Sequence, residues 1–210
     1  MMTALVAAKH GDMSQRVTSP IDGGQLSAAT DGTVIGLTVG EQMTLRDLMY
    51  GLLLRSGNDA ALAIAVAIGG SEPGFVQMMN DEARSLGLTD TNFTNPHGLD
   101  DPRLYTSAYD IARIGIELLS DENLAEIVKT KEYTPNWDNG PLENINLFLG
   151  QFPGAIGIKT GYTDTAGQTI VAAAVRDGRT LVASVMHGGD EYVDAGALLD
   201  WAFDNTQLAC

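Results

Sequence analysis

The chain has 210 residues, of which 44% are hydrophobic and 19% charged, so residues 1 to 210 are expected to bury a core as a single domain. The formal net charge of −15, with only 12 lysines and arginines, argues against binding to nucleic acid or to an anionic membrane surface. The single cysteine, Cys210, excludes an internal disulfide, and no apolar run approaches membrane-spanning length.

The first part of the chain predicts one helix followed by strands. The stretch MMTALVAAKHGD favours a helix from its first residue, has no capping residue before it and ends at Gly11. Residues 17 to 43 are rich in glycine, threonine and valine and contain the turn pairs Asp22-Gly23 and Asp31-Gly32. Small strands or hairpins are therefore expected there.

Four helices are predicted next. The first follows Thr44, with Asp47 at capping-box spacing, and the second is apolar on nearly all sides and is expected to use Asn58 as its cap. The third is the amphipathic stretch SEPGFVQMMNDEARSLG, and the fourth, TSAYDIARIGIELLSD, has Ser107 and Asp110 at capping-box spacing. An irregular loop, NFTNPHGLDDPRLY, separates the third helix from the fourth.

After residue 150 the pattern becomes that of a sheet. Residues 155 to 158 predict a short apolar strand, and two longer apolar runs are joined by Asp177-Gly178, a two-residue hairpin signal. Because these runs are nearly continuous in apolar residues, both faces of the hairpin are expected to be covered. A last helix is predicted from about Tyr192 to Asn205. Helices combined with an antiparallel sheet give an α+β fold.

The histidines give no support for a metal site. His10, His97 and His187 never occur at helical ligand spacing, and the chain has no CxxC motif. The stretch HGGDE at 187 to 191 is better explained as a turn after a strand, and the glycines lie in turns and caps rather than in a phosphate-binding loop. No metal and no organic cofactor is expected.

Two short polar stretches interrupt apolar regions. Ser56-Gly57-Asn58 lies between two predicted helices, where a plain helix–helix corner would also account for it. Lys159-Thr160-Gly161 ends a short apolar strand, where a lysine that extends into solvent is the simpler explanation. Each tripeptide alone is weak evidence, whereas their order and their local context are more informative.

The two stretches match the second and third parts of a catalytic set, Ser-x-x-Lys, Ser-Asp-Asn and Lys-Thr-Gly, of penicillin-binding proteins and class A β-lactamases. From Thr38 to Gly188 the chain resembles the serine-type D-Ala-D-Ala carboxypeptidases, the low-molecular-mass penicillin-binding proteins. The matching segments include GEQMTLRDLMYGLLLRSGNDAALAIA and FPGAIGIKTGYTDTAGQTIVAAAVRDGRTLVASVM. The resemblance implies a β-lactamase/transpeptidase-like fold of three α/β/α layers. Gly57 favours the carboxypeptidases, because class A β-lactamases usually carry aspartate there.

The first part of the set is absent. A serine nucleophile and its lysine base should stand one helical turn apart. No serine or threonine precedes any of the four lysines by three positions; the residues there are Val6, Glu126, Val128 and Ile156. In the family a segment like MTALVAAKHGD follows the motif lysine almost at once. The chain is therefore expected to lack the N-terminal strands and the nucleophile, and the full gene product to carry a signal peptide.

The resemblance also implies roles on the strand. Lys159 and the Thr160 hydroxyl would hold the free D-alanine carboxylate through charge-assisted hydrogen bonds. Gly161 would let the peptide lie along the strand edge, and the Tyr162 N–H would supply half of an oxyanion hole. Tyr162 is also a candidate for the cleft wall, against the simpler alternative of a solvated aromatic ring.

At the helix corner the resemblance gives Ser56 a proton-relay role between base and leaving amine, and gives Asn58 the substrate amide. Ser56 and Lys159 are expected to lie close together across one cleft. His97 also matches the family pattern, but the proline and glycine beside it favour a fixed loop and a structural role.

The resemblance implies removal of the terminal D-alanine from peptidoglycan stem peptides through an acyl-serine, outside the cytoplasmic membrane, with β-lactam antibiotics as further ligands. Two alternatives stay open. Without a nucleophile the chain could act as a non-catalytic binder of D-Ala-D-Ala ends or penicillin, and a β-lactamase-like hydrolase is the rival enzyme. The sequence leaves the oligomeric state open.

Overall fold

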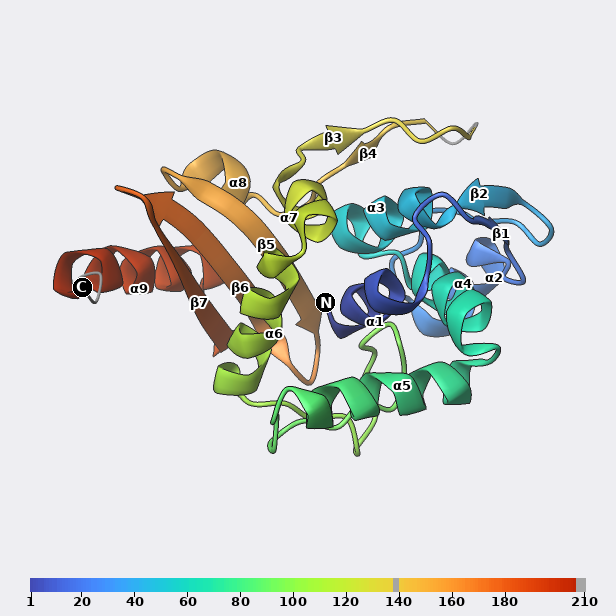
Figure 1. Ribbon diagram of the computed structural model, residues 1–210, viewed down its shortest axis with the longest axis horizontal. Helices are drawn as coiled ribbons and strands as arrows, with labels where there is room; N and C mark the ends of the chain where they lie inside the picture. The colour runs from blue at the N-terminus through green and yellow to red at the C-terminus, as the bar shows by residue number, and fades with distance from the viewer. Residues whose placement is uncertain (138–139, 207–210) are drawn as a thin grey trace. The chain divides into compact units, whose positions relative to one another are not determined.

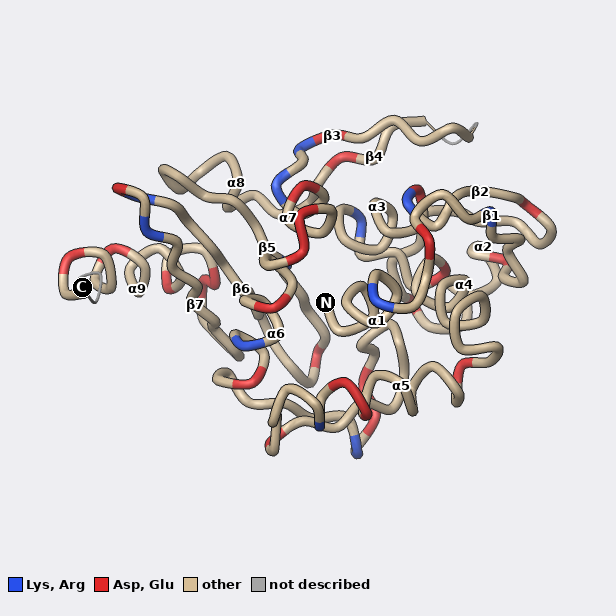
Figure 2. Tube along the Cα trace, in the orientation of Figure 1, with Lys and Arg blue, Asp and Glu red and all other residues tan. Residues whose placement is uncertain are grey.

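The computed structural model describes residues 1 to 137 and 140 to 206, and the chain divides into two compact units (Figure 1). The first unit comprises Met1–Thr106 and Thr130–Asn144, and the second comprises Ser107–Lys129 and Ile145–Cys210. Acidic positions are spread over both units rather than gathered in one place, as Figure 2 shows. Cys210 lies outside the described residues.

The first unit is built around α1 (Met2–His10), which packs against α3 (Leu45–Arg55), α4 (Asn58–Gly69) and α5 (Glu72–Ser85). Helix α1 is buried along most of its length, because its residues from Met2 to Ala7 are small or apolar apart from Thr3. Met1 provides no side-chain cap, and the helix ends at Gly11. The helix predicted for this stretch is therefore confirmed.

The prediction of strands or hairpins throughout residues 17 to 43 is wrong for its central part. Strands β1 (Arg16–Thr18) and β2 (Gln42–Thr44) do pair antiparallel, but α2 (Gly23–Thr30) lies between them. The two Asp-Gly pairs bracket this helix instead of forming hairpin turns. The Asp22 side chain accepts a hydrogen bond from the Gln25 N–H at the helix start, and Asp31 ends the helix in the left-handed region with φ 53°.

The other capping predictions have mixed outcomes. Thr44 and Asp47 form both bonds of the predicted capping box at the start of α3. The Ser107 hydroxyl accepts from the Asp110 N–H at the start of α6 (Ala108–Ser120). Asn58, however, is not the cap of α4: the cap is Gly57, without a side-chain bond, and Asn58 is the first helical residue.

A small hairpin, β3 (Glu132–Tyr133) and β4 (Leu142–Glu143), packs against α3, and Tyr133 contributes a ring contact and a hydrogen bond. The Tyr133 ring stacks on Tyr50 with centroids 3.6 Å apart, and its hydroxyl donates to Asp47 Oδ1 at 2.8 Å. Burial and the nearby Asp47 carboxylate raise the pKa of Tyr133, so the phenol keeps its proton and the bond at neutral pH.

The second unit holds an antiparallel sheet in the order β5 (Ala155–Thr163), β6 (Gly167–Arg176), β7 (Arg179–Gly188). Figure 1 shows α6 and α7 (Glu122–Lys129) on one face and α9 (Glu191–Asn205) on the other, and α8 (Phe148–Gln151) packs beside β5. Both faces of the hairpin are thus covered, as expected. Helix α7 did not emerge from the sequence pattern.

The hairpin turn confirms the Asp177-Gly178 prediction. Arg176 pairs with Arg179, and both turn residues have positive φ, 51° and 74°, which the right-handed twist of the flanking strands favours. Alternate residues of β6 then face opposite sides of the sheet. Ile170, Ala172 and Ala174 share a buried cluster with Phe148, Ala195, Leu199 and Phe203.

On the other face, Gly115 allows close packing of α6. A Cβ at Gly115 would lie 2.8 Å from Val171 Cγ1 and 3.0 Å from Ile158 Cδ1, so a larger residue would push α6 away from the sheet. Ile158 immediately precedes Lys159, and this packing therefore fixes the strand from which the candidate lysine projects.

Among the described helices, no single one is long and apolar enough to cross a membrane. Helices α4 and α5 meet that test only as a pair, across a bend of 85°.

Candidate active site

The Ser56-Gly57-Asn58 corner has a conformation set by its backbone contacts in the first unit. Ser56 ends α3 in the left-handed region, with φ 60°, and is half-buried. The Gly57 N–H donates to the Gly51 carbonyl at 3.1 Å, and the Asn58 N–H donates to the Thr33 carbonyl at 2.8 Å. The corner therefore holds two polar side chains, half-buried Ser56 and buried Asn58, on a backbone fixed by these hydrogen bonds.

Gly57 lies in a tight space, where an added side chain would need its neighbours to shift by a few tenths of an ångström. A Cβ at this position would lie 3.0 Å from Ile35 Cγ2, 3.1 Å from Asp59 Oδ1 and 3.3 Å from the Gly51 carbonyl oxygen. An aspartate at this position would need Ile35 to move. The side chain of Ile35 thus leaves little room at the middle position of this motif, which a glycine fits best.

Asp59, the residue after Asn58, is a candidate supporting residue of the site that the sequence analysis missed. Its side chain is fully buried, and its carboxylate accepts hydrogen bonds from four backbone N–H groups, those of Ile35, Gly36, Leu37 and Ala60, at 2.9 to 3.2 Å. Each of its two oxygens accepts from at least two of these N–H groups, so the carboxylate ties the loop of residues 35 to 37 to the first turn of α4. The only sequence signal was an acidic residue in the first turn of an otherwise apolar helix.

Lys159 lies on β5 in the second unit, opposite Val171 of β6. Its side chain is half-buried, and its Nζ donates to the Thr160 carbonyl at 2.7 Å. Burial lowers the pKa of Lys159 to about 8, because removal from water disfavours the charged ammonium. A cation held in this way gains more from an anionic partner than a solvated surface lysine does.

Strand β5 lies at the edge of the sheet, since it pairs with β6 alone among the described strands. Gly161 is exposed on this strand, and the Thr169 hydroxyl donates to its carbonyl at 2.9 Å. The Tyr162 ring is 63% exposed and its hydroxyl donates to Asp164 Oδ1 at 3.0 Å. The hydrogen bond to Asp164 raises the pKa of Tyr162.

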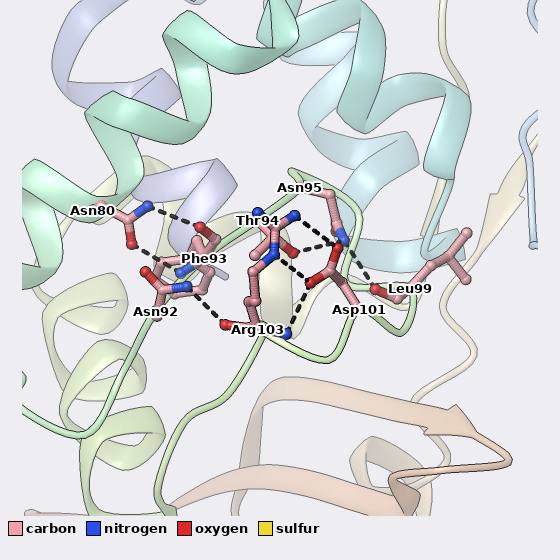
Figure 3. A network of polar contacts seen from close by, with 8 residues as sticks. All are labelled: Asn80, Asn92, Phe93, Thr94, Asn95, Leu99, Asp101 and Arg103. Carbon is pink, nitrogen blue, oxygen red and sulfur yellow. Dashed lines mark hydrogen bonds and ion pairs between the residues drawn. The ribbon is translucent and has the colours of Figure 1, made fainter.

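His97 belongs to a loop that is held by side-chain to backbone hydrogen bonds, most of them drawn in Figure 3. Asn80 bonds both the N–H and the carbonyl of Phe93, and Asn95 bonds the Gly98 N–H and the Leu99 carbonyl. His97 Nδ1 accepts from the Leu99 N–H at 3.2 Å, and burial lowers the pKa of His97.

These bonds are consistent with the fixed loop expected from its proline and glycine, and a structural role for His97 stays a prediction. Since Nδ1 accepts a hydrogen bond, the neutral ring carries its proton on Nε2. The Thr3 hydroxyl of α1 also donates to the Pro96 carbonyl, at 2.5 Å, so the loop rests on the first turn of that helix.

The candidate residues thus form two sets, each described within its own unit. Ser56, Asn58 and His97 belong to the first unit, whereas residues 159 to 162 belong to the second. That Ser56 and Lys159 lie close across one cleft stays a prediction. Within residues 1 to 137 and 140 to 206, no group of three or more His, Cys, Asp or Glu side chains could hold a metal ion.

The lowered pKa of Lys159 predicts a pH dependence of stability. The folded chain binds this proton less tightly than the unfolded chain, whose lysine has the ordinary value of 10.5. Lys159 therefore costs stability below pH 8, and the cost disappears as the pH rises from about 8 toward 10.5. Because solvent still reaches the side chain, we expect a gain on the order of 1–2 kcal/mol across this window.

The measurement is urea unfolding of the chain and of Lys159→Met at pH 7, 8, 9 and 10. The difference in unfolding free energy between the two proteins should shrink as the pH rises, because methionine keeps the packing and removes the titration. A difference that stays constant with pH would show that Lys159 has an ordinary pKa.

A helical unit that presents a Ser-X-Asn corner, with an antiparallel sheet that presents Lys-Thr-Gly on its edge strand, defines the class of the penicillin-binding DD-peptidases. The family model described as D-alanyl-D-alanine carboxypeptidase matches residues 1–190. The chain belongs to the D-alanyl-D-alanine carboxypeptidase family.

Curated relatives agree with this assignment. The chain is 35% identical to D-alanyl-D-alanine carboxypeptidase DacF of Bacillus subtilis, over 97% of this chain and 54% of the relative. It is 37% identical to DacB2 of Mycobacterium tuberculosis, over 97% of this chain and 72% of the relative, and 40% identical to DacA of Escherichia coli, over 80% and 42%. The chain thus spans about half the length of several of its relatives.

Solved structures show the same fold. The crystal structure of a D-alanyl-D-alanine carboxypeptidase from Mycobacterium tuberculosis superposes with a TM-score of 0.90 at 34% identity, over 99% of this chain and 81% of that one. A Streptomyces DD-transpeptidase superposes with a TM-score of 0.89 at 29% identity, over 97% and 85%. The expected α+β fold of transpeptidase type is confirmed.

Proposed function

We propose that the two units together form the catalytic domain, residues 1 to 210, of a serine-type D-Ala-D-Ala carboxypeptidase. In this reaction an acyl-serine forms as the terminal D-alanine leaves the peptidoglycan stem peptide, and water then releases the shortened peptide. The observation that carries the proposal is the half-buried lysine of Lys-Thr-Gly on the edge strand of a chain that belongs to this family. No cofactor is involved.

Lys159 and Thr160 receive the terminal carboxylate of the substrate. Among the residues that the structure describes, the ammonium of Lys159 donates to a neutral carbonyl oxygen, that of Thr160, so a carboxylate is a stronger partner for the same proton donor. The Thr160 hydroxyl adds a second donor. A carboxylate also stabilises the charged form of the lysine, which compensates for the cost of its burial.

Gly161 and Tyr162 bind the peptide backbone. An exposed glycine on an edge strand leaves room for an extended peptide to pair as an additional strand. The Tyr162 N–H forms half of the oxyanion hole, and the exposed Tyr162 ring borders the peptide.

Ser56 and Asn58 complete the site from the first unit. Ser56 relays the proton between base and leaving amine, and Asn58 holds the substrate amide. This assignment requires both side chains to face Lys159 across one cleft. It is supported by the left-handed turn at Ser56, which ends one helix and lets the next begin with Asn58 two residues later.

The family's serine nucleophile and lysine base occur nowhere in the 210 residues at the motif spacing. We therefore expect the chain as given to bind D-Ala-D-Ala ends and β-lactams without turnover. The same absence makes a non-catalytic binder the second candidate function. Family members typically act outside the cytoplasmic membrane, and we place the activity of this protein there too, in the periplasm or cell wall.

Titration of the ¹⁵N-labelled chain with a peptide that ends in D-alanyl-D-alanine tests the proposal. We expect amide shifts at residues 159 to 162 and at the Asn58 side chain to follow one binding curve, because both sets contact one ligand. The same peptide with L-alanine ends is the control and should shift neither set. Shifts confined to one set, or equal shifts with both peptides, would contradict a shared D-alanine site.

A further inference from the structure

We infer that Asp59 is a positioning residue, which fixes the Asn58 amide by holding the loop of residues 32 to 37 against it. The inference rests on the proposed function only in giving Asn58 a substrate contact. Asp59 itself touches neither substrate nor reacting atoms, because it is buried beneath the loop with none of its surface exposed.

The 32–37 loop binds the Asp59 carboxylate through three successive backbone N–H groups. Ile35 donates to Oδ1 at 3.0 Å, and Gly36 and Leu37 each donate to Oδ2 at 2.9 Å. Gly36 has a positive φ of 87°, which bends the backbone so that consecutive N–H groups converge on one point. Such a concave set of N–H groups binds anions, and here the anion belongs to the chain itself.

The same loop contacts the motif on its other side. The Thr33 carbonyl accepts from the Asn58 N–H at 2.8 Å, and a Cβ at Gly32 would overlap the Asn58 side-chain nitrogen. Ile35 lies close to Gly51 and Gly57, as the short distances from a Cβ built at either glycine show. The Asn58 amide therefore rests on a loop that the next residue, Asp59, holds in place.

Only a carboxylate satisfies this arrangement. An ionised aspartate offers acceptors alone, and four N–H groups point at it, from residues 35, 36, 37 and 60. In Asp59→Asn one of the two oxygens becomes an NH₂ group and faces N–H donors. At least one loop bond is then lost with little change in shape, so the loop should open more often.

Two measurements on the full 210-residue chain test the inference without substrate. In Asp59→Asn, hydrogen exchange at residues 35 to 37 should accelerate roughly tenfold or more beyond any change in global stability. The Asn58 side-chain ¹⁵N–¹H signals should also shift or broaden.

The matched control is Asp47→Asn, another buried first-turn aspartate of the same unit, which bonds Thr44 and Tyr133. It should lower stability but leave the 32–37 loop and the Asn58 signals unchanged. If both variants alter the Asn58 signals equally at matched stability, Asp59 is merely structural and the inference fails.

Gly32→Ala is a second variant that tests the contact between the 32–37 loop and the Asn58 amide. It keeps Asp59 and is expected to fold. The added methyl group meets the Asn58 amide directly, so it should shift the Asn58 signals and weaken binding of the D-alanyl-D-alanine peptide while residues 35 to 37 keep their exchange protection. Unchanged Asn58 signals in this variant would overturn the inference.

Binding of the D-alanyl-D-alanine peptide to these variants distinguishes failure of this inference from failure of the proposed function. If the peptide binds, Asp59→Asn and Asn58→Ala should weaken it, and the double variant should lose little more than Asn58→Ala alone. Fully additive losses would overturn the inference. If the peptide binds to no form of the chain, the proposed function of this chain fails, whereas the exchange and Asn58 signals still decide whether Asp59 positions the amide.

Discussion

The 210-residue chain should remain unlabelled by a fluorescent penicillin, and a chain extended upstream by a family segment that ends in Ser-x-x-Lys should become labelled one to one. The extension would continue the helix that α1 forms from Met2, so the new serine and lysine would stand one turn apart. An acyl-enzyme needs that serine, and no serine of the present chain has a lysine at the motif spacing. The extended chain should also release D-alanine from a stem peptide.

Mass spectrometry of the digested, labelled protein identifies the serine that carries the penicillin. An extension with Ala-x-x-Lys is the matched control and should give no label. A covalent adduct on Ser56, in either chain, would show that the roles are divided differently, because Ser56 is assigned to proton relay. An extended chain that folds and yet stays unlabelled would favour the non-catalytic binder.

In the extended chain, Lys159→Met should lower kcat/KM for a peptide with a free terminal carboxylate about 10- to 150-fold, because a charge-assisted hydrogen bond contributes roughly 1.5–3 kcal/mol. The same peptide with an amidated terminus lacks the carboxylate, so its kcat/KM should change far less. Lys131→Met is the control variant, since Lys131 is an exposed lysine of the first unit.

Equal losses of kcat/KM on the two peptides would show that Lys159 does not act through the terminal carboxylate. The pH profile gives an independent check. In the protein without substrate the pKa of Lys159 is about 8. Binding of the peptide carboxylate should therefore weaken as the pH rises through that value, because the neutral amine no longer attracts the anion. The amidated peptide should show no such decline.

Much of the fold was predictable because its signals are local. The Thr44–Asp47 capping box and the Asp177-Gly178 hairpin each depend on residues within four positions of one another, and both predictions are confirmed. Residues 23 to 30 show the limit of such signals. An Asp-Gly pair serves equally well as a turn and as a helix start, and only the bond from the Gln25 N–H to Asp22 distinguishes them.

The candidate site also has one part that local sequence signals reveal and one part that they do not. The Ser56-Gly57-Asn58 and Lys159-Thr160-Gly161 stretches could be recognised because each is a contiguous tripeptide. The proposed role of Asp59 could not be recognised, because it depends on N–H groups more than twenty residues away in the sequence. The error at Asn58 also concerns a contact distant in the sequence: the Asn58 N–H donates to the Thr33 carbonyl, and Asn58 is the first residue of α4 rather than its cap.

The position of β5 at the sheet edge has a further consequence, for the behaviour of the protein at high concentration. An edge strand that can accept a peptide can also accept the edge of a second copy, and sheets joined in this way grow into aggregates. A lysine on such a strand opposes this, because pairing two copies would bring together partly desolvated ammonium groups of like charge. Lys159 would thus keep the strand open to an anionic peptide while disfavouring self-assembly. Selection for solubility and selection for substrate would then act on the same side chain.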